Sequence, residues 1–262
     1  NRALQLDPDS ATAMAGLGMV YSNQGHWQRS LELLTRASEL SKDSTPTYFY
    51  GNALLTAGYI SEAQQAFLQA ERMDPVYPQL QVLMGVNAMV VGDLASARNY
   101  YKRAIDGGNI NGVSGMFWLE LEAGNPESAT GYIEEYIALR EAEQTRSPQT
   151  QSMQTVIAAI RDPSLLQNGI EAALDRENLV ALNYFGADRE IAQLVNSDMA
   201  SGNTIANSLR LCFNLWAPRF AELRQLPEYK QFLRDFGLVD LWKERGWPDL
   251  CRPAGEDDFV CE

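Results

Sequence analysis

Side chains that commonly do chemistry in active sites are scarce in this sequence. It has a single histidine, His26, in the turn-like segment Gly25-His26-Trp27, and three cysteines. With one histidine in the chain, a histidine-based catalytic triad or a metal site built from several histidines is nearly excluded. Because turns between helices are usually solvated, we expect His26 to have a structural or surface role.

Recognisable catalytic motifs are missing as well. The sequence contains no glycine-rich phosphate loop, no nucleophile elbow and no pair of metal ligands at helical spacing. Adjacent carboxylates occur at Glu134-Glu135 and at Asp257-Asp258, where a solvated helix face and a turn account for them. The sequence therefore predicts a non-enzymatic protein that has no catalytic residues and binds no metal or cofactor.

Cys251 and Cys261 flank a short loop that contains Pro253 and Gly255, and three interpretations are open. A disulfide would stabilise the chain by roughly 3 kcal/mol by constraining the unfolded state. A metal site would lack suitable partners, because the nearby acids are hard ligands that match thiolates badly. Two free buried thiols are the third possibility. We favour the disulfide. Cys212 lies in an apolar run and is interpreted as a small buried hydrophobe, although its pairing with either of the others stays open.

Composition and charge narrow the class of protein further. The chain has 262 residues, of which 45% are hydrophobic, so it can build a core without a metal or a disulfide. The 34 acidic residues outnumber the 21 basic ones along the whole chain, for a net charge of −13. This charge disfavours a nucleic-acid surface. No apolar run is long enough to span a membrane and no signal-peptide pattern is present, so we expect membrane contact only through a segment preceding Asn1.

A repeat of about 34 residues organises the first half of the chain. Three positions keep the same type of residue in each repeat unit: a first glycine, a second glycine and a bulky residue. In a hairpin of two helices, the first glycine lets the helices touch, the second allows a positive φ in the turn, and the bulky residue fills the space between units. These positions are occupied by Gly18, Gly51 and Gly85; by Gly25, Gly58 and Gly92; and by Leu34, Phe67 and Tyr101.

This pattern resembles the tetratricopeptide repeat (TPR). The resemblance implies an all-α fold, a right-handed superhelical solenoid of antiparallel helix hairpins. Within a TPR array over 1–142 we expect a partial unit at 1–10, units at 11–43, 44–77 and 78–111, and a degenerate unit at 110–142. Because Asn1 is not a methionine and residues 1–10 look like the end of a unit, we expect a longer protein. After a loop over 141–150, further degenerate hairpins fill 151–202, in which 153–161 pairs with 164–176 and 179–186 pairs with 189–199.

The last segment, 203–262, is rich in aromatic residues and forms the expected helical C-terminal cap and tail. Three of its motifs, Trp216 to Pro218, Leu223 to Tyr229 and Gly246 to Cys251, resemble the ending of the periplasmic TPR domain of bacterial membrane-anchored regulators. These are the CadC-like winged-helix activators and the TPR-containing class III adenylate cyclases. The resemblance implies a sensory or docking domain in the periplasm, where an oxidising environment suits the disulfide. We expect the aromatic residues to cover the last hairpin as core rather than to line a ligand pocket.

TPR arrays bind partners on a concave face that is lined by the first helix of each unit. The resemblance therefore implies that the partner-binding residues of this chain are Asn23, Tyr48, Asn52, Thr56, Val86, Met89 and Trp118. Tyr48 and Asn52 lie one helical turn apart on one face. Lys and Arg are absent from these positions, which disfavours the carboxylate clamp of chaperone-binding TPR domains. Two interpretations stay open: these residues bind a partner, or later helices fold back and bury them.

The leading hypothesis is a non-enzymatic interaction or sensory domain of a membrane-anchored signalling or transcription regulator, located in the periplasm. Its partner would be a protein or peptide, and a homodimer is a reasonable expectation. The alternatives are a stand-alone TPR scaffold, cytoplasmic or periplasmic, and a small-ligand sensor with a pocket between the array and the cap.

Overall fold

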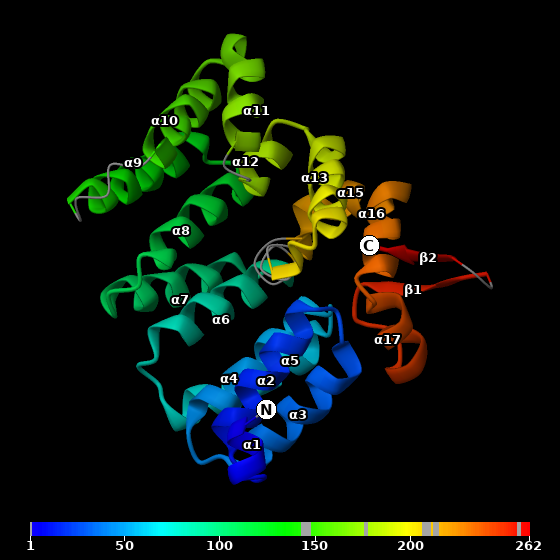
Figure 1. Ribbon diagram of the computed structural model, residues 1–262. Coiled ribbons are helices and arrows are strands. Elements are labelled where there is room, and N and C mark those ends of the chain that lie inside the picture. Colours follow the sequence, from blue (N-terminus) through cyan, green and yellow to red (C-terminus); the bar gives the residue numbers. More distant parts are fainter. Residues whose placement is uncertain (1, 143–147, 176–177, 206–210, 212–214, 256–257) are drawn as a thin grey trace.

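The computed structural model describes residues 2–142, 148–175, 178–205, 211, 215–255 and 258–262 (Figure 1). The array consists of helices α1 (Arg2–Leu6), α2 (Ala11–Asn23), α3 (Trp27–Leu40), α4 (Ser44–Thr56), α5 (Ile60–Met73), α6 (Pro78–Val90), α7 (Leu94–Asp106), α8 (Asn111–Glu122) and α9 (Pro126–Ala142). It continues through α10 (Pro148–Arg161), the short helix η1 (Pro163–Leu165), α11 (Leu166–Asp175), α12 (Leu179–Tyr184) and α13 (Asp188–Ser201). The chain therefore has the predicted all-α solenoid architecture.

Consecutive helices pack as hairpins, α2 with α3, α4 with α5, α6 with α7 and α8 with α9. The expected loop over 141–150 is wrong at both ends, because α9 continues to Ala142 and α10 begins at Pro148. Proline is tolerated in the first turn of a helix, where its missing N–H would have no partner anyway. Pro148 is therefore the first residue of a helix, while 143–147 lie outside the described residues.

The repeat glycines meet the bulky residues of their own hairpins. A Cβ placed on Gly85 would lie 2.5 Å from Cε1 of Tyr101, and one on Gly51 would lie 2.6 Å from Cε1 of Phe67. The ring of Tyr101 also faces Gly115 of the next unit, so it packs both within its hairpin and between units. In the turn after α4, Gly58 has a φ of +88°, as expected for a position that favours glycine.

The C-terminal segment contains η3 (Pro218–Phe220), α15 (Ala221–Gln225), α16 (Pro227–Asp235), α17 (Leu238–Arg245), and strands β1 (Cys251–Ala254) and β2 (Asp258–Cys261). The purely helical cap expected from the sequence is thus incomplete, because β1 and β2 form an antiparallel hairpin. Helices α15 and α16 pack on α13, whereas α17 lies beside α3 (Figure 1). The cap covers the last hairpin and also returns to the first one.

Candidate interaction surface

The predicted concave groove is largely filled at its centre. All eleven residues from Leu80 to Val90 of α6 are buried, including Val86 and Met89. The hydroxyl of Tyr101 lies 3.2 Å from Sδ of Met89, within hydrogen-bond reach. The prediction that Val86 and Met89 are accessible groove residues is therefore wrong, because this chain's own core surrounds them.

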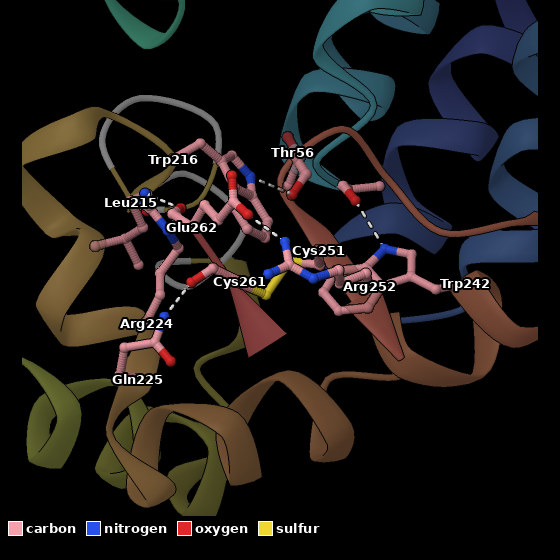
Figure 2. Close-up of a disulfide and its surroundings, with 11 residues drawn as sticks. Thr56, Leu215, Trp216, Arg224, Gln225, Trp242, Cys251, Arg252, Cys261 and Glu262 are labelled. Carbon is pink, nitrogen blue, oxygen red and sulfur yellow. Dashed lines mark hydrogen bonds and ion pairs between the residues drawn. A yellow bond between two sulfur atoms is a disulfide. The ribbon is translucent and has the colours of Figure 1, made fainter. Parts of the chain in front are cut away.

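Thr56 is buried for an identifiable reason. The indole N–H of Trp216 donates a 3.1 Å hydrogen bond to the Thr56 carbonyl oxygen (Figure 2), which brings the cap over the end of α4. The Thr56 hydroxyl in turn donates a 2.8 Å bond to the carbonyl oxygen of Asn52. Thr56 is thus part of the junction between the array and the cap, and its predicted place on an open groove is wrong.

The other four predicted positions are half-buried. The ring of Tyr48 lies 5.2 Å from that of Tyr77, edge to face, and both Tyr48 and Asn52 make further interactions. Asn23 at the end of α2 and Trp118 on α8 keep part of their surface accessible. A partner contact at these four residues stays a prediction.

A disulfide joins Cys251 to Cys261, which face each other across β1 and β2 (Figure 2). The buried guanidinium of Arg224 lies against the end of this hairpin, where its Nε donates a 2.7 Å bond to the carbonyl oxygen of Glu262. Arg224 also donates bonds of 2.8 Å and 3.0 Å to the carbonyl oxygens of Leu215 and Ala217. The disulfide and Arg224 therefore tie the C-terminal strand to the cap. Cys212 lies outside the described residues.

A second set of contacts docks α17 and its following turn onto the second hairpin. Arg245 forms two bonds with the Glu62 carboxylate, at 2.8 Å and 2.7 Å, and its guanidinium lies 4.3 Å from the Tyr59 ring centroid. The hydrogen bonds to Glu62 raise the pKa of Arg245. The Tyr59 hydroxyl donates a 2.7 Å bond to the carbonyl oxygen of Gly246. Residues of the array and of the cap are thus interlocked along one seam.

An open groove of about 600 Å³ runs along this seam between α3 and α17. Leu31 and Leu241, both buried, contribute its apolar floor, and the charged side chains of Glu32, Glu39 and Glu244 stand along it. It adjoins a smaller hollow of about 380 Å³ beside the exposed side chain of His26. This groove is a candidate site for a partner in the part of the chain that the structure describes.

Only the α3 wall of this groove could be recognised in the sequence. Residues Gln28, Leu31, Thr35 and Glu39 recur at intervals of three and four along α3, so they share one helix face. Nothing in the spacing shows that α17, some 200 residues later, forms the opposite wall.

Among the described residues, no group of three His, Cys, Asp or Glu side chains is placed to hold a metal ion. No described helix is long and apolar enough to cross a bilayer.

No protein-family model and no curated protein matches this sequence. Among solved structures, a chain of the APC/C hetero-tetramer Cut9-Hcn1 matches 89% of this chain with a TM-score of 0.58 and 15% identity, and this chain spans 45% of its length. MamA matches 55% of this chain and 85% of its own, with a TM-score of 0.47 and 20% identity. PilF of Pseudomonas aeruginosa matches 87% of this chain and 98% of its own, with a TM-score of 0.48 and 15% identity.

The likeness to the Cut9-Hcn1 chain, together with the helix pairs and their glycine contacts, shows a solenoid fold of the TPR type. At 15% identity, the likeness extends to the fold alone.

Proposed function

We propose that this chain is a non-enzymatic protein-binding module. The observation that carries the proposal is the open groove at the seam of α3 and α17, whose floor is apolar and whose rim is charged. Interaction sites commonly combine an apolar centre with a polar rim. Asn23 and Trp118, which keep part of their surface accessible, are proposed as a second contact surface.

The module belongs, in this proposal, to a bacterial membrane-anchored signalling or transcription regulator, and it lies in the periplasm. Two features support this. The C-terminal motifs that carry the resemblance include Trp216 and Gly246, both of which bond to the array. The disulfide between Cys251 and Cys261 suits an oxidising compartment.

Photo-cross-linking in the native host tests the protein-binding role. A photoreactive residue is placed at Gln28, on the α3–α17 groove, at Asn23, on the concave face, or at Glu135, an exposed control position on α9. We expect adducts of defined mass from Gln28 or Asn23 and none from Glu135. Absence of adducts from both Gln28 and Asn23 would contradict a partner-binding role.

The compartment is tested by counting thiols. Protein isolated from its native host and denatured without reductant should expose one reactive thiol per chain, that of Cys212, because Cys251 and Cys261 are joined. Three reactive thiols would contradict the periplasmic location.

A small-ligand sensor is the second candidate function, since a groove does lie between the array and the cap. Its volume of about 600 Å³ falls within the range of small-molecule sites, about 300–1,000 Å³. A screen for ligands that raise the melting temperature tests this function. A ligand whose stabilising effect is lost when Thr35 in the groove is changed to Trp would support it, and no shift across broad libraries would count against it.

A further inference from the structure

The α3–α17 groove has the length and shape of a docking channel for a short segment. Its α3 wall extends from Gln28 to Glu39, about three helical turns or about 16 Å at 1.5 Å per residue. The α17 wall supplies Leu241, Glu244 and Arg245. Leu31 and Leu241 are 6% and 5% exposed, so a side chain entering the groove would rest on a closed apolar floor.

The charges along the groove are mostly negative once existing ion pairs are counted. Arg36 pairs with Asp9, and Arg245 pairs with Glu62, so each of these cations already has a carboxylate partner. Glu32, Glu39 and Glu244 form no ion pair with any described residue.

The adjoining hollow, which also contains His26, adds one further charged residue of each sign, Asp240 and Arg29. Taken with the groove, the seam therefore presents an excess of carboxylates around an apolar floor.

We propose that this groove binds a basic amphipathic segment of a partner protein, which deepens the protein-binding function proposed above and rests on it. The segment's apolar side chains would pack on Leu31 and Leu241, and its Lys or Arg side chains would face Glu32, Glu39 and Glu244. Charge complementarity of this kind favours a cationic partner and repels anionic ones. A second copy of this chain is disfavoured at this face, because each copy carries a net charge of −13.

Fluorescence anisotropy tests this proposal with a labelled amphipathic peptide of Lys, Leu and Ala and the full chain. The decisive variant is Glu32→Lys/Glu39→Lys on exposed positions of α3. Its control is Asp106→Lys/Glu135→Lys, which makes the same change in net charge at exposed positions of α7 and α9. We expect about a tenfold or greater loss of affinity for the groove variant and less than about twofold for the control. Equal loss in both variants would overturn the proposal, since binding would then depend on overall charge alone.

The apolar half of the proposal has its own variants. Thr35→Trp fills the groove without changing charge, and we expect it to weaken binding of the Lys/Leu/Ala peptide. A peptide in which Ser replaces Leu should bind at least about tenfold more weakly. Equal binding of the Ser peptide would overturn the amphipathic partner in favour of a simple polycation, and equal binding of a Glu/Leu/Ala peptide would overturn the charge complementarity. Helical circular dichroism and melting temperature verify that each variant is folded.

Failure of this inference is distinguishable from failure of the proposed function. If the peptide does not bind but Gln28 or Asn23 yields adducts in the host, the module binds a partner of another chemistry. If the peptide binds but neither position yields an adduct, the groove has the inferred chemistry and the proposed cellular role is wrong.

Discussion

The indole N–H of Trp27 donates a 2.7 Å hydrogen bond to the carbonyl oxygen of Phe236, a residue 209 positions later in the chain. The two rings also meet edge to face, with centroids 5.3 Å apart. Trp27 begins α3 and Phe236 directly follows α16, so this contact ties the cap to the first complete hairpin. The same kind of bond recurs where Trp242 donates to the carbonyl oxygen of Ala57 at 2.9 Å.

Trp27→Phe keeps an aromatic ring but removes the donor. The Phe236 carbonyl would lose this buried bond, so we expect the free energy of unfolding to fall by about 1–3 kcal/mol. Urea unfolding measures the change. The neighbouring exposed variant Gln28→Ala should stay within about 0.5 kcal/mol of the parent, and an equally small effect of Trp27→Phe would contradict the importance of this contact.

Gly85→Ala tests the helix contact that underlies the repeat. The added Cβ would lie 2.5 Å from the buried ring of Tyr101, so overpacking should cost about 1–3 kcal/mol or more. Gly16→Ala is the matched control, because Gly16 lies in α2 with no atom within 4 Å of a Cβ built there. Since alanine favours helix over glycine, the control should be neutral or stabilising by up to about 1 kcal/mol. Similar losses in both variants would contradict the packing described for the repeat.

Sequence reasoning succeeded where contacts are local and periodic. Gly51 contacts Phe67 and Gly85 contacts Tyr101, each pair inside a single hairpin. The glycine and the bulky residue therefore recur at a fixed spacing in the sequence. The hairpins themselves could therefore be predicted. The contact between Trp27 and Phe236 has no such period, so the return of the cap to the first hairpin could not be foreseen.

The candidate site was harder to predict for a related reason. Val86 and Met89 lie on one helix face with the spacing of a binding stripe, yet the same residue types also build a core, and here they are buried. The residues of β1 and β2 are too few to show an alternating pattern. The α3 half of the groove has a helical spacing, but Leu241 joins it only through the tertiary fold.

Reduction of the disulfide should destabilise the cap. Cys251 and Cys261 are separated by 10 positions, and for a loop of this size the stabilisation is about 3 kcal/mol or less. Thermal unfolding with and without reductant measures it. Cys212→Ser should respond to reductant as the parent does, whereas Cys251→Ser/Cys261→Ser should not respond. A double variant that loses as much stability in reductant as the parent would contradict this assignment.

The buried carboxylate of Glu120 predicts a specific pH dependence. Burial by itself would raise the pKa of Glu120, but hydrogen bonds from Arg98 and Asn125 outweigh it and hold the pKa below 4.5, the ordinary value for a glutamate. A lowered pKa in the folded state stabilises the protein above that value, and this stabilisation is lost as the pH falls through the folded pKa.

We therefore expect Glu120→Gln to be less stable than the parent near neutral pH, with a gap that narrows as the pH falls below about 4.5. Urea unfolding at several pH values measures the gap. The exposed Glu135→Gln variant should show almost no difference at any pH. A gap for Glu120→Gln that stays constant with pH would contradict the role assigned to the carboxylate.

Hydrogen–deuterium exchange can show whether a partner segment binds between α3 and α17, because it locates the bound segment on the protein. The full chain is compared with and without the Lys/Leu/Ala peptide. We predict new protection of amides in α3 and α17, with α8 and α9 unchanged. Protection confined to the concave helices α2, α4 and α8, or no protection at any concentration of peptide, would contradict the assignment of partner binding to the seam between the array and the cap.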